Sequence, residues 1–169
     1  MKTNTEKSTA KALFSVLKPY IIAVIVGFMI SWVFKLIFSP TIVSGSSMYP
    51  TYESGDIVKV NKEFTPSDIT YGTVVVFDLG KKKDYFKRVV ALPGDSLYID
   101  DKGFLIVNDL KSEYQFGYCN DAGCLSEEIT LKDNEYFCMG DNRNASMDCR
   151  EFGPIDYSCI KSVVVKKIF

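Results

Sequence analysis

The feature that most constrains this chain is a long apolar segment near its N-terminus. Residues 20–34 carry no charged side chain, Lys35 interrupts the run, and residues 36–38 continue it. A helix needs about 20 residues to cross a bilayer, and Tyr20 to Phe38 reaches that length if the flexible stem of Lys35 extends toward the headgroups. The run is apolar on all sides, unlike a one-sided core helix, and it lacks the small-residue cleavage site of a removable leader. We therefore predict a membrane anchor.

The anchor divides the chain into three predicted regions: a tail (1–18), a transmembrane helix (19–38) and a main domain (39–169). Residues 1–38 carry a net charge of +4, whereas residues 39–169 carry −5. The positive-inside rule then predicts a single-pass type II protein of the cell membrane, with a cytoplasmic N-terminus and an extracytoplasmic main domain. The lipid bilayer is thus an expected partner. Nucleic acid is not, because phosphate binding needs clustered positive charge.

Beyond Pro40 the sequence is typical of a β-rich domain. Short runs rich in β-branched and aromatic residues predict strands at 57–60, 73–77, 85–91, 135–139 and 162–165, and a hairpin of 97–99 with 104–107. No segment after residue 39 has sustained helical periodicity. The predicted fold class is mostly β: an antiparallel β-sheet or partly closed β-barrel on a single N-terminal transmembrane helix.

Histidine is absent from the chain, and cysteine occurs five times. The first fact excludes Ser-His-Asp and Cys-His catalysis, so a hydrolase of this sequence needs lysine or a carboxylate as its base. Cys119 and Cys124 are close enough to close a small disulfide loop, although pairing cannot be deduced from sequence. A four-cysteine zinc site lacks a C-x-x-C pair. We expect no metal and no other cofactor.

Three segments concentrate residues that carry chemistry. The first, residues 44–51, contains three serines around Gly45, which permits close backbone approach, and Pro50 stiffens its exit. Its composition is also that of an ordinary turn. Met48 is an apolar residue in this polar loop and can dock on a hydrophobic surface.

The second segment is the predicted strand at 85–91. Alternation places Lys87 and Val89 on one face and Phe86, Arg88 and Val90 on the other. The two basic residues are either an exposed pair on an edge strand or include a partly buried lysine. Burial disfavours the ammonium and lowers the pKa, so that a neutral lysine can take the proton of a serine hydroxyl.

The third segment, residues 140–154, is dense in hydrogen-bonding groups. It is either a solvated loop with surface ion pairs or a loop locked beside a site. In the second interpretation Asp141 pairs with Arg143, and Asp148 pairs with Arg150, in bidentate fashion.

Together, and in this order, the three segments resemble the type I signal peptidases. The family motif S-M-x-P-T is matched by residues 47–51. The K-R-V and P-G-D motifs are matched by 87–89 and 93–95, and the G-D-N-R-x-x-S-x-D-S-R-x-x-G motif by 140–153 with Cys149 in place of a serine. The resemblance covers nearly the whole chain. It implies a membrane-bound serine endopeptidase that removes signal peptides from secretory preproteins by Ser/Lys catalysis. It also implies cleavage after small residues, Ala-x-Ala, and the translocation machinery is a further candidate partner.

The resemblance also implies a role for each matched residue. Ser47 is the nucleophile, Lys87 the general base, and Ser146 the serine that orients the lysine. The backbone N–H of Ser47 holds the oxyanion, with Gly45 as a candidate second donor where some members have a serine. Gly45 matches the Gram-positive short form. Four charged residues would support the site: Asp141, Arg143, Asp148 and Arg150. Met48 and Tyr49 would contact the substrate.

Several alternatives remain open at this level. Ser44 and Ser46 are rival nucleophiles, although alignment on Met48 and Pro50 favours Ser47. A self-cleaving repressor-type protease shares the Ser/Lys pair but has a DNA-binding domain instead of a membrane anchor. Mitochondrial inner-membrane peptidases are closer relatives, and Arg143 favours the bacterial pattern. A membrane-tethered β domain that only binds partners would function without Ser47.

Overall fold

The structure is a computed structural model that describes residues 2–38, 40–80 and 83–169. Side chains are described for residues 14–33, 40–80 and 83–169. The chain forms two compact units, Met1–Ser39 and Pro40–Phe169, and each is described by itself.

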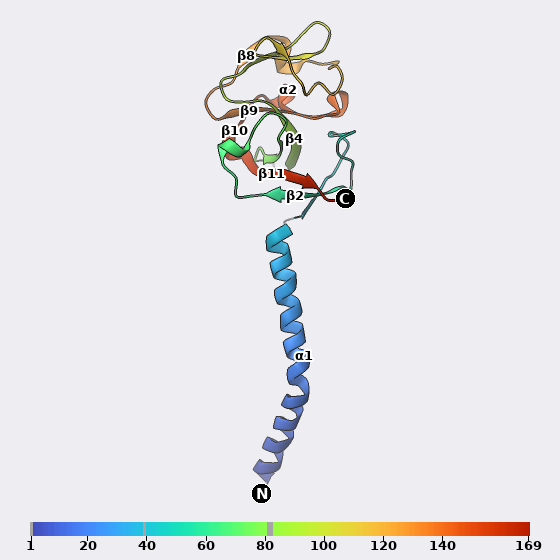
Figure 1. Cartoon of the computed structure of the whole chain (residues 1–169), viewed down its shortest axis with the longest axis vertical. Helices are drawn as coiled ribbons and strands as arrows, with labels where there is room; N and C mark the ends of the chain where they lie inside the picture. Colours follow the sequence, from blue (N-terminus) through green and yellow to red (C-terminus); the bar gives the residue numbers. More distant parts are fainter. Residues whose placement is uncertain (1, 39, 81–82) are drawn as a thin grey trace. The chain divides into compact units, whose positions relative to one another are not determined.

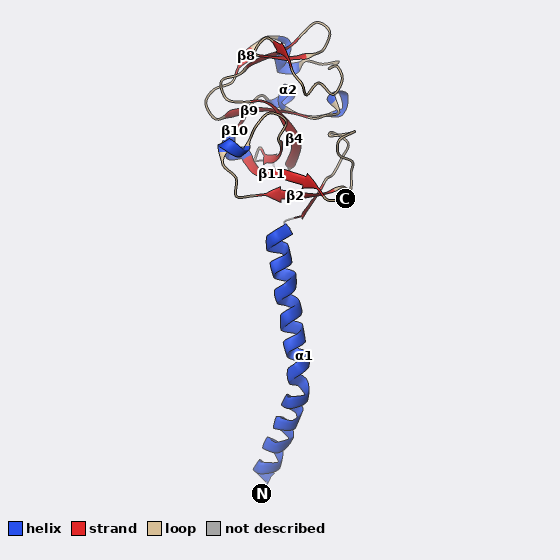
Figure 2. Cartoon of the chain, in the orientation of Figure 1, coloured by secondary structure: helices blue, strands red, loops and turns tan. Residues whose placement is uncertain are grey.

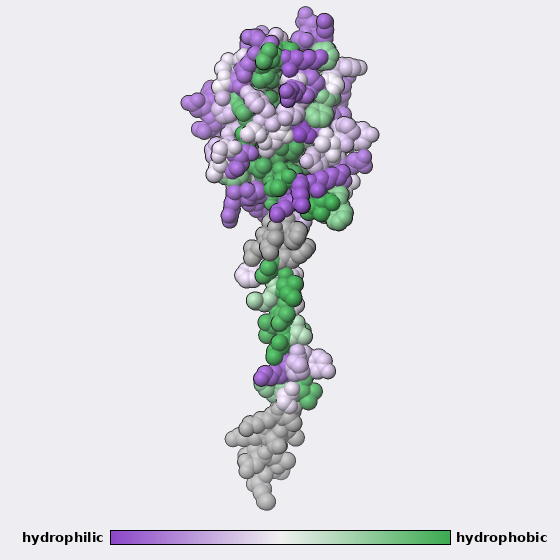
Figure 3. Space-filling model, viewed as in Figure 1, coloured by the Kyte–Doolittle hydropathy of each residue, from purple (hydrophilic) through white to green (hydrophobic). Residues whose placement is uncertain are grey.

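The N-terminal unit is one continuous helix, α1 (Lys2–Phe38) (Figure 1). Within it, Phe14–Val33 is long and apolar enough to cross a membrane, and none of this stretch is buried. Figure 3 shows apolar side chains clustered along this part of the helix. The predicted apolar N-terminal helix is confirmed. The predicted boundary between tail and span, at residues 18 and 19, lies inside the helix. We also predicted that the Lys35 side chain extends toward the headgroups, and this side chain lies outside the described ones.

The C-terminal unit is built mainly from two antiparallel sheets (Figure 2). The larger has seven strands. In spatial order they are β1 (Pro40–Ile42), β2 (Ile57–Asn61), β11 (Ile160–Lys167), β3 (Val74–Asp78), β4 (Asp84–Ala91), β9 (Glu135–Met139) and β10 (Ile155–Asp156). The smaller sheet has the order β7 (Leu110–Lys111), β6 (Leu105–Val107), β5 (Ser96–Ile99) and β8 (Ile129–Thr130).

Short helical turns complete the unit. They comprise α2 (Cys149–Phe152) and four 3₁₀ turns: Pro66–Asp68, Gly123–Ser126, Arg143–Ala145 and Tyr157–Cys159. The mostly β, antiparallel fold predicted from the sequence is confirmed. Neither sheet closes into a barrel, because β1 and β10 end the larger sheet, and β7 and β8 end the smaller one.

One hydrophobic core joins the two sheets. Phe77 of β3, Leu97 of β5, Leu105 of β6 and Phe137 of β9 are all fully buried in it. A second, smaller cluster of Val43, Val58 and Val60 lies under β1 and β2, with Phe86 packed against it. The strand that will carry the site is therefore covered by apolar side chains.

The register of β4 positions the site. β3 pairs with β4 from Asp84 to Arg88, but β9 pairs with β4 only from Arg88 to Ala91. The N-terminal half of β4 thus has no described strand on the β9 side. This half faces the loop that follows β1, across a groove described below.

Candidate active site

The loop between β1 and β2, residues 43–56, is fixed by its own backbone and is called the serine loop here. Tyr49 N donates to the Ser46 carbonyl (3.1 Å), Tyr52 N to the Met48 carbonyl (2.9 Å), and Gly55 N to the Val43 carbonyl (2.9 Å). The Met48 side chain is 1% exposed and anchors the loop in the domain. The apolar residue thus docks within this unit and holds the polar residues around it in place.

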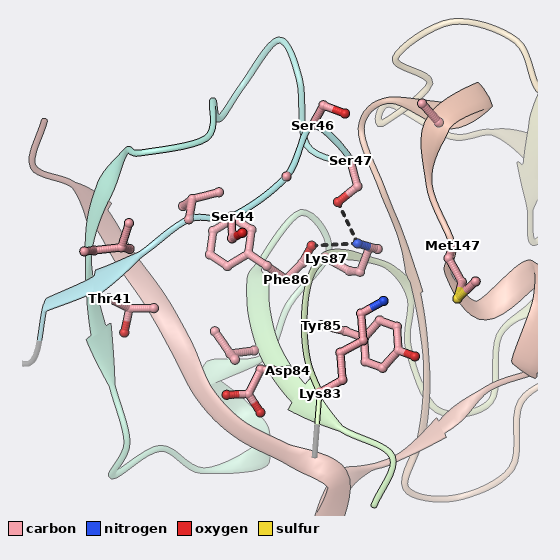
Figure 4. Close-up of a pocket in the computed structure, with 15 residues that line it drawn as sticks. Thr41, Ser44, Ser46, Ser47, Lys83, Asp84, Tyr85, Phe86, Lys87 and Met147 are labelled. Carbon is pink, nitrogen blue, oxygen red and sulfur yellow. Dashed lines mark hydrogen bonds between the residues drawn. The ribbon is translucent and has the colours of Figure 1, made fainter. Parts of the chain in front are cut away.

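The serine loop meets β4 at one close contact. Lys87 Nζ donates to Ser47 Oγ at 2.7 Å and to the Phe86 carbonyl at 3.1 Å. Figure 4 shows the two side chains pointing toward each other. Ser44 and Ser46 are exposed, and among the described residues Ser47 is the serine that bonds Lys87.

Lys87 is buried, with 5% of its surface exposed. It lies on β4 opposite the fully buried Val75 of β3, one residue before the pairing of β4 with β9 begins. The exposed edge-strand alternative is therefore wrong. Burial lowers the pKa of Lys87 below its ordinary value. The negative charge of Asp148 opposes this shift, and the nearby charge of Lys83 adds to it. A hydroxyl held 2.7 Å from an amine whose charged form is disfavoured can pass its proton to that amine.

Asn142, a residue of the third segment, holds the serine loop in place. Its backbone N–H donates to the Ser47 carbonyl (3.0 Å), and its side-chain Nδ2 donates to the Ser46 carbonyl (3.1 Å). No role was predicted for Asn142 from the sequence. It lies in the matched motif at 140–153, but the two residues whose carbonyls it bonds are 95 and 96 residues away and are brought to it only by the fold.

Arg88 and Asp141 form a buried bidentate ion pair. Arg88 Nε lies 2.8 Å from Asp141 Oδ1, and Nη2 lies 2.6 Å from Oδ2. Burial lowers the pKa of Arg88, but the hydrogen bonds and charge of Asp141 outweigh it and the pKa is raised. This corrects the predicted pairing of Asp141 with Arg143, because β4 brings a closer guanidinium from outside the segment.

Arg143 is buried, and its guanidinium has no carboxylate partner among the described residues. Its Nη2 donates to the Tyr114 carbonyl and its Nη1 lies 3.6 Å from Met139 Sδ, while Nε has no partner among the described residues. Burial lowers the pKa of Arg143. Its link to Asp141 is a backbone bond, from Arg143 N to the Asp141 carbonyl at 3.0 Å.

The predicted pair of Asp148 and Arg150 is present and bidentate. Nε lies 2.9 Å from Oδ1, and Nη2 lies 3.0 Å from Oδ2. Asp148 also caps α2 and accepts from Gly140 N at 2.9 Å. Arg150 Nη2 donates to the Arg143 carbonyl at 2.6 Å. The pair therefore ties β9, the 143–146 turn and α2 together beside Lys87.

Ser146 lies next to the site without a bond to Lys87. Its Oγ is buried and has no hydrogen-bond partner among the described residues. It crowds Gly140: a Cβ added at Gly140 would lie 2.1 Å from Ser146 Oγ and 2.5 Å from the Ser47 carbonyl oxygen. The structure brings Ser146 close to the serine loop. However, the second hydrogen bond of Lys87 Nζ goes to the Phe86 carbonyl and not to Ser146.

The two candidate oxyanion donors, the N–H groups of Ser47 and Gly45, differ in whether they already have a hydrogen-bond acceptor. In the described part of the chain, the Ser47 N–H donates no hydrogen bond. Gly45 has no side-chain donor, and its N–H points to Ser54 Oγ at 3.4 Å. Its φ of +91° is a conformation that favours glycine.

A groove of about 380 Å³ opens beside Ser47 and Lys87 (Figure 4). It runs between residues 41–47 and residues 83–87, and three more side chains complete its wall: Val76, Ala145 and Met147. The sequence did not single out these three, because only the fold brings their segments together. Met48 is buried, and Tyr49 lines a different pocket with Pro50 and Phe116, so neither residue lines this groove.

All five cysteines are free, so the Cys119–Cys124 disulfide that the sequence allowed is not formed. Cys149 is fully buried, and its Sγ accepts from Cys138 N at 3.2 Å. Burial raises the pKa of this thiol well above its usual value. Within the described residues, no cluster of three or more metal-ligating side chains occurs.

Comparison with known proteins places this geometry in a family. The family described as "Signal peptidase, peptidase S26" matches residues 13–168. Signal peptidase I of Bacillus amyloliquefaciens is 36% identical over 165 residues, 89% of this chain and 84% of that protein. Signal peptidase IB of Staphylococcus aureus (strain COL) is 34% identical over 157 residues, 81% of each chain. A crystal structure of a signal peptidase I from Enterococcus faecalis V583 aligns with a TM-score of 0.46 at 21% identity, over 57% of this chain and 96% of that one.

The protein is thus a serine peptidase, a hydrolase that acts on peptide bonds. The chain belongs to the signal peptidase family, peptidase S26, with signal peptidase I proteins among its relatives. An exposed apolar N-terminal helix suits a membrane-anchored member of that family.

Proposed function

We propose that this protein removes N-terminal signal peptides from exported preproteins by Ser/Lys acyl-enzyme catalysis, and that it cuts after small residues of the Ala-x-Ala type. The observation that carries the proposal is the 2.7 Å contact between Ser47 Oγ and the buried Lys87 Nζ, beside an open groove. The family relationship supports signal peptides as the substrate class.

The reaction begins with proton transfer. Neutral Lys87 takes the proton of Ser47 as Oγ attacks the scissile carbonyl, and the backbone N–H of Ser47 stabilises the developing oxyanion. The resulting lysine ammonium protonates the leaving amine, and the C–N bond breaks to leave an ester on Ser47. Lys87 then takes a proton from water, which attacks the ester, and returns it to Ser47.

Supporting roles follow from the same contacts. Asn142 holds the serine loop, and the Asp148–Arg150 pair holds the neighbouring turn at 143–146. Ser146 is proposed to orient Lys87. A buried hydroxyl without a partner is unfavourable by about 1–3 kcal/mol, so a bond to the lysine during the reaction would satisfy Ser146 Oγ.

The groove supports an extended substrate. β1 is an edge strand, and the first half of β4 has no described strand on one side, so backbone groups on both walls can pair with a peptide. Val43, Val76 and Phe86 make much of the wall apolar. A peptide that runs between these walls would present alternate side chains to them, which favours small residues at the first and third positions before the cut.

Replacing the residue just before the cut tests this specificity. We expect an Ala→Phe change there to lower kcat/KM by about 100-fold, because an overlarge side chain displaces the carbonyl from Ser47. The measurement is cleavage of matched peptides by the full chain in detergent, with the same change two positions after the cut as control. Equal cleavage of the Ala and Phe peptides would contradict the proposal.

The pH dependence tests Lys87 as base. Its pKa is lowered, so the neutral form is present above that pKa and is lost as pH falls through it. We expect kcat/KM to rise with pH in a single step, whose midpoint lies below 10.5, the ordinary pKa of lysine. Burial is the main cause of the lowered pKa, the charge of Lys83 adds to it, and the charge of Asp148 opposes it. A rate that stays flat down to strongly acid pH would exclude lysine as the base.

The proposed location is the cell membrane, with a cytoplasmic N-terminus and an extracytoplasmic catalytic domain. The excess of lysine in residues 1–38 supports this orientation. Only nine residues lead from Phe38 to Ser47, a reach of at most about 30 Å. Catalysis would thus occur near the outer membrane surface, where preproteins meet the bilayer and the translocation machinery.

A further inference from the structure

The groove beside Ser47 contains a charged side chain that takes no direct part in the proposed proton transfers. Lys83, just before β4, lines this groove together with Lys87. Its Nζ lies 5.3 Å from the centre of the Tyr85 ring. Figure 4 shows this amino group turned into the pocket on the side of Lys87, beside the Tyr85 ring. The ring contact places the cation at the wall of the groove.

Lys83 has no carboxylate partner within the described residues. The acidic residue of the groove wall, Asp84, bonds Lys161 Nζ at 2.7 Å instead. Lys161 also contacts Asp78 at 3.0 Å. The carboxylate nearest in sequence is therefore already paired, and the ammonium of Lys83 remains available to a ligand.

The charge state of the groove changes with the catalytic state. Lys87 works as a neutral amine, so at that stage Lys83 is the wall residue of the described groove that carries an unpaired positive charge. An ammonium in a partly enclosed groove attracts a carboxylate and repels a second cation more strongly than it does in open water.

We propose that Lys83 is a specificity-determining residue, which favours substrates with an acidic side chain in the stretch before the cut and disfavours those with a basic one. The inference rests on the proposed function, because it requires the peptide to lie in this groove. It goes further by assigning a charge preference to one wall residue. Lys83 is still exposed, and exposed ion pairs are modest, so we expect a preference of roughly 3- to 5-fold for each sign of charge.

A charge-swap experiment tests the inference. The substrates are peptides that differ only at the second, fourth or fifth position before the cut, where each carries Asp, Asn or Lys. The full chain in detergent is compared with K83Q and K83E, and kcat/KM is measured at low and high salt. K102E is the matched control, because Lys102 lies in the turn between β5 and β6, outside the groove.

We expect the wild type to cleave the Asp peptide about ten times faster than the Lys peptide at the most sensitive position. K83Q should bring this ratio near one, K83E should reverse it, and K102E should preserve it, with all preferences weaker at high salt. General damage to the enzyme would lower the rates of all three peptides and leave the ratio unchanged.

Two failures are distinguishable. If K83E and K102E give the same Asp-to-Lys ratio at every position, Lys83 does not select substrates, although the proposed function stands. If the wild type cleaves none of the peptides, including the Asn series, the proposed function itself fails.

Discussion

Replacing Lys87 by alanine is expected to lower kcat for cleavage of a signal-peptide-bearing precursor by at least about 10³-fold. Lys87 Nζ is the group that bonds Ser47 Oγ in the described part of the chain, and the absence of histidine leaves no imidazole to replace it. Ser47→Ala should reduce cleavage to the uncatalysed background, because it removes the nucleophile itself. Processing of a radiolabelled precursor by the full-length variants measures both effects.

Two controls separate loss of chemistry from loss of structure. Ser44→Ala and Ser46→Ala remove the neighbouring exposed hydroxyls and should retain most activity. The circular dichroism spectrum of each variant should match that of the wild type. Near-normal cleavage by Lys87→Ala would show that another group takes the serine proton, and activity in Ser47→Ala with loss in Ser46→Ala would move the nucleophile by one residue.

Removing Asp141 is expected to have the largest effect on stability. Asp141→Ala leaves the guanidinium of Arg88 buried without its carboxylate, in a place where the two side chains are only 10% and 1% exposed. Breaking such a pair from one side lowers the free energy of unfolding by about 3–5 kcal/mol. Urea unfolding of the full chain in detergent, monitored by tyrosine circular dichroism, measures the change.

The exposed pair of Lys132 and Glu135 is the matched control. It has an N–O distance of 3.4 Å, and the lysine side chain is 83% exposed. Lys132→Gln should change the free energy of unfolding by less than about 1 kcal/mol. The double variant Arg88→Met with Asp141→Leu should recover much of the loss, since it leaves no unpaired charge. A loss from Asp141→Ala no larger than that from Lys132→Gln would mean that the ion pair is not effectively buried.

The fold was predictable wherever local pattern and burial agree. The strand predicted at 135–139 has the same bounds as β9, and those predicted at 57–60 and 85–91 differ from β2 and β4 by one residue. Four strands were missed, β1, β7, β8 and β10, and each has only two or three residues. So few residues leave no detectable alternation, because such strands form only where a longer neighbour offers its edge.

The site was predictable in part. Three motifs brought Ser47, Lys87 and the charged residues of 140–153 into consideration, but sequence proximity gave the wrong partner for Asp141. Asp148 and Arg150 are near neighbours on one capped turn, so their pairing depends on local geometry. Asp141 and Arg88 are 53 residues apart and meet only through the pairing of β4 with β9.

The adjacency of Lys87 and Arg88 on β4 makes the strand intolerant of length changes in the turn before it. Side chains alternate between the two faces, so a slip of one residue exchanges the residues on each face. Arg88 would then lie opposite Ser47, and an arginine, which keeps its proton in proteins, cannot act as the base. Lys87 would lie opposite Asp141, and its ammonium cannot form the two parallel hydrogen bonds that the Arg88 guanidinium makes with this carboxylate. A single-residue insertion or deletion between β3 and β4 would therefore damage catalysis and stability together, whereas a two-residue change keeps each side chain on its own face.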